Sequence, residues 1–322
     1  MARKLRIQYP GAIYHLMNRG DRRERIFQDD TDRQRFLDTL NQACQKTGWQ
    51  VHAYCLMPNH FHLVVETPQP NLVSGMKWLL GTYTSRHNRR HQEFGHLFSG
   101  RYKSLIVDGS GSGYLKTVCD YVHLNPARAR LLKPAEPLRA FGWSSYPRYL
   151  EAPSRRPAWL RVDRLLGEWG IPKDSAAGRR VFAAGMEQRR RESGAGEFKP
   201  VERGWCLGGE EFRRELLAQV HPRPGASHFG EVVREAESAR AERLVWEGLQ
   251  RLGWSEEALR ARRKGEAGKV ELARELRAQT TMPLAWIAQR LSMGSRGYLA
   301  FLLGQGAKRR SPSSTTQASL LI

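Results

Sequence analysis

The sequence predicts an α+β protein in which a ferredoxin-like β-α-β-β-α-β domain is followed by an all-α region. Three observations lead to this prediction. Between residues 12 and 107, short apolar stretches and longer segments of helical spacing follow one another in the order β-α-β-β-α-β. After residue 209 only helical spacing recurs, and it ends in a helix-turn-helix pattern. The chain has 322 residues, which is too long for one small domain, so two or three domains are expected.

The elements of the N-terminal domain are expected to be joined by short connections. Asp30 or Thr31 is available as N-cap of the first helix, and Pro58-Asn59 is expected to form the turn between the second and third strands. The expected strands are residues 12–18, 49–57, 60–66 and a part of 97–107, and the expected helices are 30–46, 71–90 and 114–123.

The C-terminal half has a different composition. Residues 150–200 are diluted by Pro, Gly and charge, and the run Arg189-Arg190-Arg191 before residues 192–196 is typical of a flexible joint. Helices are expected at 210–220, 229–253 and 270–278. The domains predicted from this pattern are 1–150 (catalytic), 151–208 (basic linker or extension), 209–306 (helical) and 307–322 (disordered tail).

The last helices have the spacing of a helix-turn-helix. Leu284, Ile287 and Leu291 keep helical spacing, a short turn follows at residues 292–294, and the spacing resumes after Ser295. Ser295 is expected to cap the second helix, with Arg296 and Tyr298 near its N-terminal end, where side chains can reach base edges in a major groove. A small helical bundle without any DNA contact is the alternative.

The charge balance indicates a polyanionic partner. Lys and Arg number 53 against 32 acidic residues, giving a net charge of +21, which exceeds what solubility requires. The four cysteines form no CxxC pair and are expected to be reduced thiols. No apolar run reaches 18 residues, so no membrane span is expected. A cytoplasmic, nucleoid-associated protein fits these features.

Two short motifs carry the chemistry. In Pro58-Asn59-His60-Phe61-His62 the two imidazoles point the same way, because alternate side chains on a strand share a face. In the segment 120–126, Tyr121 and Asn125 lie one helical turn apart on one face of a helix. Two imidazoles and an amide oxygen supply three sides of a metal site, and a tyrosine beside that metal can attack a phosphate.

Each of these roles has a competing interpretation. Asn125 precedes Pro126, so it is also suited to be the N-cap of a new helix. The phenol of Tyr121 would need a metal or a base nearby to act as a nucleophile, and its ring would otherwise pack in the core. Tyr114 is the main competitor for the nucleophile, and Tyr102 and Tyr83 are weaker ones.

Residues 9–150 resemble the catalytic domain of the HUH single-tyrosine transposases, which are IS200-like, and within them the REP-associated tyrosine transposases. The resemblance implies a ferredoxin-like fold, metal ligands at His60, His62 and Asn125, Mg²⁺ or Mn²⁺ as the metal, and Tyr121 as nucleophile. It also implies cleavage and rejoining of single-stranded DNA at or near hairpins through a 5′-phosphotyrosine. The matching stretches are Tyr14 to Gly20, Met57 to Leu63, Gly100 to Ser104, Asp120 to Ala129 and Trp143 to Tyr146.

Basic residues beside these motifs are candidates for binding backbone phosphates. The candidates are Arg19, Arg101, Lys103, Arg128 and Arg130. Arg101 and Lys103 alternate on the expected fourth strand and would share a face. Single-stranded DNA hairpins are the expected partners, with flanking duplex DNA as a possible second one, and the protein is expected to be a monomer or a homodimer.

Two other functions are compatible with part of these features. A DNA-binding regulator would recognise hairpins without catalysis. Such a protein has no need of the full set His60, His62, Tyr121 and Asn125. A metal-dependent nuclease that uses water as nucleophile would not need Tyr121.

Overall fold

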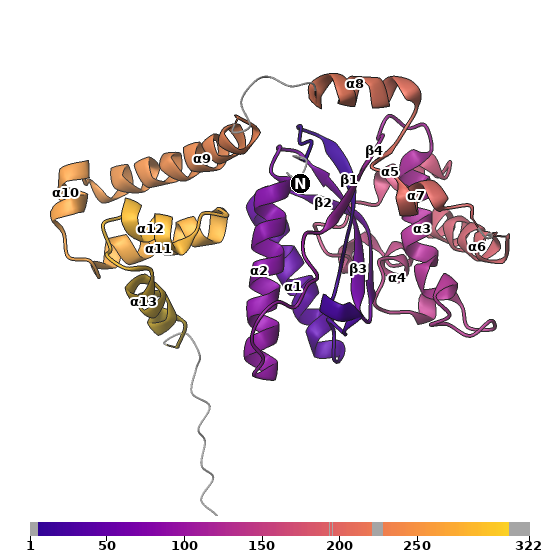
Figure 1. Cartoon of the computed structure of the whole chain (residues 1–322), viewed down its shortest axis with the longest axis horizontal. Helices are drawn as coiled ribbons and strands as arrows, with labels where there is room; N and C mark the ends of the chain where they lie inside the picture. The colour runs from indigo at the N-terminus through magenta and orange to yellow at the C-terminus, as the bar shows by residue number, and fades with distance from the viewer. Residues whose placement is uncertain (1–5, 193, 195, 221–227, 309–322) are drawn as a thin grey trace, which may run out of the picture. The chain divides into compact units, whose positions relative to one another are not determined.

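The computed structural model describes residues 6–192, 194, 196–220 and 228–308 (Figure 1). The chain divides into two compact units, 1–226 and 227–322. Among the described residues, no helix combines the length and the hydropathy needed to cross a bilayer. The expected tail falls largely on 309–322, outside the described residues, and α13 continues through Lys308.

A mixed five-stranded sheet with the strand order β2-β3-β1-β4-β5 forms the centre of the first unit. The first four strands are antiparallel to their neighbours, and the short β5 is parallel to β4. The α+β class and the element order expected from the sequence are thus observed, with β5 as an edge strand that the sequence did not indicate. The strands are β1 (Ala12–Arg19), β2 (Gln50–Met57), β3 (His60–Thr67), β4 (Lys103–Val107) and β5 (Cys206–Leu207).

Helices cover both faces of the sheet (Figure 1). On one face, α1 and α2 bury Phe36, Leu40, Met76 and other side chains in a first core. On the opposite face, α3 buries Leu115 and Val118 in a second core. The helices of this unit are α1 (Asp30–Thr47), α2 (Leu72–His91), α3 (Tyr114–Arg128), α4 (Tyr146–Leu150), α5 (Asp163–Glu168), α6 (Ala176–Glu192), α7 (Lys199–Arg203) and α8 (Glu210–Val220), with short 3-10 turns at Asp21–Arg23, Leu138–Ala140 and Pro153–Arg155.

Three local expectations need correction. The N-cap of α1 is Asp29, whose side chain accepts from the backbone N–H of Asp32, and not Asp30 or Thr31. Strand β4 begins at Lys103, so Arg101 precedes it. Helix α3 does not stop near His123 but continues through Pro126 to Arg128, so Asn125 is not the N-cap of a new helix.

The segment expected to be a linker or an extension, 151–208, packs in the first unit. Phe182 and Met186 of α6 and Phe198, just before α7, are fully buried in the second core, beside residues of α3. The run Arg189 to Arg191 belongs to α6 rather than to a joint. The compact unit that contains the sheet therefore extends well past residue 150.

We expect Phe182→Ala to destabilise this unit by about 3–5 kcal/mol, the usual cost of truncating a buried phenylalanine. Its ring contacts Tyr149 and Trp169, so the truncation leaves a cavity between α4 and α5. Chemical denaturation measures the loss. Val181→Ala, which changes an exposed neighbour on the same helix, is the control and should alter the free energy of unfolding far less. Equal effects of the two substitutions would mean that α6 does not belong to the core.

The second unit consists of helices. Its core contains Leu244, Leu272, Ile287, Leu291 and Leu299. Helices α12 and α13 are separated by residues 291–295, and Ser295 caps α13 by accepting from the N–H of Tyr298 at 3.2 Å. The helices are α9 (His228–Leu252), α10 (Glu256–Ala261), α11 (Ala267–Gln279), α12 (Leu284–Arg290) and α13 (Arg296–Lys308).

Candidate active site

The two histidines of β3 face α3. Phe61 between them is fully buried in the first core, so the alternation of the strand turns His60 and His62 to the other face of the sheet. Their rings lie edge to face at a centroid distance of 5.0 Å. His60 stands opposite Arg19 on β1, and His62 stands opposite Met17.

Helix α3 brings the tyrosine and the amide to the same place. Asn125 Nδ2 lies 3.2 Å from His62 Nε2, and the Tyr121 ring lies edge to face on the His62 ring at 5.5 Å. Because an i, i+4 pair shares one helix face, both side chains reach His62 together. The structure therefore brings the four residues singled out from the sequence together, with His62 as the common neighbour and His60 beside it.

A third histidine, His15 of β1, belongs to this cluster and was not singled out from the sequence. Its Nε2 lies 2.9 Å from His62 Nδ1, and the two rings stack at 5.1 Å. It also meets the Tyr121 ring edge-on at 5.6 Å. Its place in the first strand, two residues from Met17, was visible in the sequence, but only the pairing of β1 with β3 shows that it faces His62.

Burial keeps these imidazoles neutral. It lowers the pKa of His15 to about 4, and burial together with the nearby Arg19 charge lowers the pKa of His60 to about 4. The pKa of His62 is also lowered, first by burial and then by the neighbouring His15 and His60. Near pH 7 the nitrogen lone pairs are therefore available to a metal ion.

The hydroxyl of Tyr121 is not activated by the protein alone. Burial raises its pKa, as does the charge of Glu202, while Arg128 and Asn125 act in the opposite direction without cancelling the effect. The guanidinium of Arg128 lies over the Tyr121 ring at 5.0 Å and over the Phe198 ring at 5.0 Å. The phenol is thus held in place by packing but protonated, and it needs an added charge to become a nucleophile.

The competing tyrosines are placed differently. Tyr83 is buried in the first core and donates to the backbone oxygen of Ile26 at 2.6 Å. Tyr102 lies beneath the guanidinium of Arg6 at 3.7 Å. Tyr114 begins α3 and is half-buried against the second core. Among the tyrosines that the structure describes, Tyr121 is the one whose ring contacts both His62 and His15.

Comparison with known proteins finds a family that resembles the N-terminal part of the chain. Residues 8–125 match the family model described as "Transposase IS200 like". Over these residues the chain is therefore similar to IS200-like transposases. The match includes β1 to β4 and ends at Asn125 of α3, so His60, His62, Tyr121 and Asn125 all lie inside it.

A solved structure is similar to a part of the chain. It is described as "Structure of the REP associates tyrosine transposase bound to a REP hairpin", and the similarity has a TM-score of 0.40 at 14% sequence identity. The aligned region covers 51% of this chain and 93% of that chain. No curated protein matches the chain.

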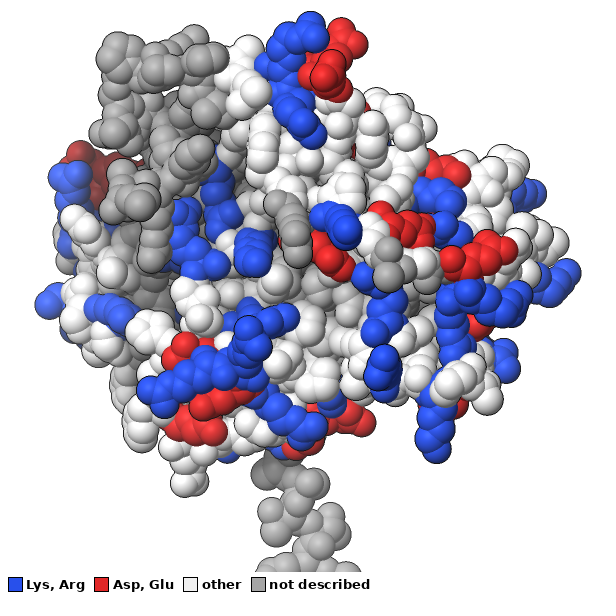
Figure 2. All heavy atoms as spheres, turned by 45° about the vertical axis from the view of Figure 1, so that its right-hand side comes forward, with Lys and Arg blue, Asp and Glu red and all other residues white. Residues whose placement is uncertain are grey.

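The basic candidates of the transposase domain lie at different places around the site. Arg19 stands opposite His60, and Lys103 stands opposite Met17, which pairs on its other side with His62. Arg128 pairs with Glu202 at 2.9 Å. Arg101 and Arg130 are exposed, Arg101 just before β4 and Arg130 just after α3. On the face shown in Figure 2, Lys and Arg side chains are spread among acidic ones.

The remaining candidates belong to the second unit. Arg296 and Tyr298 are exposed on the first turn of α13, next to the Ser295 cap. Tyr298 is 41% exposed and Phe301, one turn further, is 58% exposed. This leaves polar and aromatic side chains accessible at the start of the helix that the sequence predicts to enter DNA.

Proposed function

We propose that the protein is a transposase that cleaves single-stranded DNA at or near hairpins and rejoins it through a 5′-phosphotyrosine. The observation that carries the proposal is the convergence of Tyr121 and Asn125 on His62. A tyrosine that only packs in the core has no need of neutral histidines and an amide beside it, as Tyr121 has. The strand order with antiparallel neighbours supports the ferredoxin-like assignment of this domain.

In the proposed reaction the oxygen of Tyr121 attacks the scissile phosphorus. The bond between the phosphorus and the 3′ oxygen of the upstream strand breaks. The phenol loses its proton, the 3′ oxygen gains one, and the upstream strand leaves with a 3′ hydroxyl. The 5′-phosphate remains on Tyr121. Attack by another 3′ hydroxyl on this ester reverses the step and joins two strands without ATP.

The side chains fit a divalent metal, Mg²⁺ or Mn²⁺ by the family resemblance. His62 Nδ1 is engaged by His15, and His60 Nδ1 lies 2.7 Å from Asn59 Oδ1, so a metal ion would take the Nε2 atom of each ring. At His62 the ion would replace the contact between Nε2 and the Asn125 amide nitrogen. Asn125 would add its amide oxygen, since the two ends of an amide are exchanged by a simple flip. When bound, the ion would polarise the phosphate and supply the positive charge that Tyr121 lacks.

A denaturing gel tests the proposal against both alternatives. A labelled hairpin with a single-stranded flank is incubated with the protein, with and without Mn²⁺. A covalent protein–DNA adduct that requires Mn²⁺ supports the transposase. Free fragments without an adduct would indicate a nuclease that uses water, and binding without cleavage would indicate a regulator.

DNA binding should weaken steeply with salt, because phosphate contacts release counterions. For single strands each contact adds about −0.7 to the slope of log K against log salt. We expect Lys103→Ala to reduce this slope by about one such unit, since Lys103 lies on the site face of the sheet. Lys77→Ala is the control, because Lys77 is exposed on α2 on the opposite face. Identical slopes for both variants would remove Lys103 from the DNA path. Arg19, Arg101, Arg128 and Arg130 are proposed to make similar contacts.

We further propose that α12 and α13 form a helix-turn-helix that binds duplex DNA flanking the hairpin. Arg296→Ala should weaken duplex binding by about 1–3 kcal/mol if the side chain reads a base edge, and Tyr298 would contribute beside it. Fluorescence anisotropy with flanked and unflanked hairpins measures the difference. Arg277→Ala, on α11, is the control. If Arg296→Ala binds both substrates like the wild type, these helices have another role.

A further inference from the structure

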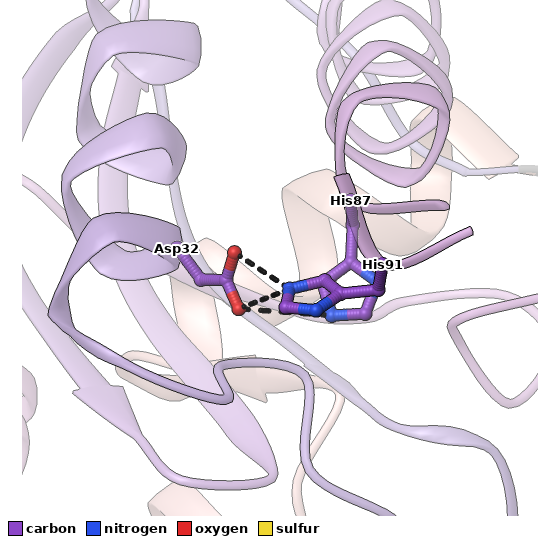
Figure 3. A group of neighbouring side chains, drawn as sticks. All are labelled: Asp32, His87 and His91. Atoms are coloured by element: carbon purple, nitrogen blue, oxygen red, sulfur yellow. Dashed lines mark hydrogen bonds and ion pairs between the residues drawn. The ribbon is translucent and has the colours of Figure 1, made fainter. Parts of the chain in front are cut away.

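A second cluster of potential metal ligands lies on the other face of the sheet, between α1 and α2 (Figure 3). Asp32 comes from the first turn of α1, and His87 and His91 come from the last turns of α2, one helical turn apart. His91 Nε2 lies 2.9 Å from Asp32 Oδ2, and His87 Nε2 lies 3.9 Å from the same oxygen. One potential ligand atom from each of the three side chains lies within 4.8 Å of the others.

His87 has no partner that explains its burial. Its side chain is 1% exposed, and both ring nitrogens are buried without a hydrogen bond to any residue that the structure describes. The Asn88 side chain acts on the pKa of His87, and Glu93 lies 3.6 Å from its Nδ1, but neither contact has hydrogen-bond geometry. A buried ring nitrogen without a partner is costly, and a metal ion would use its lone pair.

The distances suit a tetrahedral ion. Bonds of about 2.0–2.2 Å to nitrogen and oxygen in a tetrahedron place the ligand atoms roughly 3.3–3.6 Å apart. The two distances from Asp32 Oδ2, 2.9 and 3.9 Å, lie on either side of this range, and the ligand atoms of the two imidazoles are within 4.8 Å of each other. The side chains would have to move closer together around an ion. The His91 side chain is 20% exposed, so the cluster can be reached from solvent on that side.

Both oxygens of Asp32 lie near His91 Nε2, and each has one further partner. Oδ1 accepts from Arg90 at 2.7 Å, and Oδ2 accepts from the Gln28 N–H at 2.9 Å. Burial acts to raise the pKa of Asp32, but these hydrogen bonds and that of His91 outweigh it and leave the pKa lowered. Burial also lowers the pKa of His87. An anionic carboxylate and a neutral imidazole are the forms that bind a metal.

We propose that Asp32, His87 and His91 bind a borderline divalent metal ion, with Zn²⁺ as the first candidate. Two imidazoles and one carboxylate are a common zinc ligand set, whereas Mg²⁺ prefers oxygen ligands. A water molecule would fill the fourth position. The ion would join the start of α1 to the end of α2, so its effect is on stability rather than on the chemistry of Tyr121. This site is independent of the proposed transposase reaction.

Equilibrium dialysis of the full-length chain against Zn²⁺ alone tests the site. The parent is His60→Ala/His62→Ala, so that the imidazoles of the Tyr121 site do not compete. We expect this parent to bind one equivalent of Zn²⁺ and its Tm to rise with added Zn²⁺. Adding His91→Ala should weaken binding by about tenfold or more, since the loss of even an outer partner of a ligand costs roughly 10–100-fold.

His96→Ala, which changes an exposed histidine in the loop after α2, is the matched control and should leave Zn²⁺ binding unchanged. His91→Gln keeps a polar side chain at the helix end but lacks the imidazole, so it should lose Zn²⁺ while retaining the far-UV spectrum of the parent. If the parent does not fold, wild type should bind one equivalent more than His91→Ala. Equal Zn²⁺ binding with and without His91, or a folded parent that binds none, would leave only an ion pair between His91 and Asp32 and would overturn the proposal.

Discussion

Replacing Tyr121 by phenylalanine is expected to abolish both DNA cleavage and the covalent protein–DNA adduct while leaving hairpin binding almost unchanged. The substitution removes one oxygen and keeps the ring that packs on His62, His15 and Phe198. Loss of a covalent nucleophile can cost on the order of 10⁶-fold in rate. Cleavage of a labelled hairpin and detection of the adduct on a denaturing gel measure the two activities, and a binding titration measures affinity.

Tyr114→Phe is the matched control, because it removes the same atom from the same helix without touching the histidine cluster. It should cleave and form the adduct like the wild type. An adduct in Tyr121→Phe that is missing in Tyr114→Phe would move the nucleophile to Tyr114. Fragments without an adduct in the wild type would instead favour a water nucleophile.

The grouping of the candidate site residues was largely predictable because the patterns that relate them are local. Alternation along a strand places His60 and His62 on one face of that strand. The i, i+4 spacing places Tyr121 and Asn125 on one face of a helix. Neither rule says which histidine of another strand completes the cluster. His15 was missed because its contact with His62 depends on the pairing of β1 with β3, which is a long-range feature.

The same reason applies to Asp32, His87 and His91. Helical spacing shows that the two histidines share a face of α2, but only the packing of α1 against α2 brings the carboxylate to them. Long-range packing of this kind leaves no periodic trace in the sequence.

The boundaries were less predictable than the elements. Residues 150–200 are diluted by Pro, Gly and charge, which led to the prediction of a linker or extension over 151–208. A few large apolar side chains are nevertheless enough to attach this segment to the second core. Phe182 and Met186 do stand one helical turn apart, so a signal was present. Pro126 suggested a helix end, because it lacks the N–H that would donate to the carbonyl of Val122. The helix nevertheless continues through Pro126 for two residues, so the missing hydrogen bond falls near its end.

His62→Ala is expected to eliminate cleavage and to weaken Mn²⁺ binding more than His60→Ala does. His62 is the residue that His15, Asn125 and Tyr121 all contact, so its loss removes a ligand and also the group that orders the others. His60 contacts Asn59 and His62 and is less buried. Calorimetric titration with Mn²⁺ measures the affinity, and the hairpin gel measures cleavage.

The substitution His62→Ala can also destabilise the fold, because it leaves a cavity and takes away the common partner of His15 and Asn125. His62→Gln keeps polar atoms in that space and should fold better, yet it lacks the imidazole and should still be inactive. Thermal unfolding separates loss of fold from loss of metal, and His96→Ala serves as a histidine control outside the cluster. If His62→Gln binds Mn²⁺ as tightly as the wild type and still cleaves, His62 is not a ligand, and its place between His15 and Asn125 would serve only to hold α3 against the sheet.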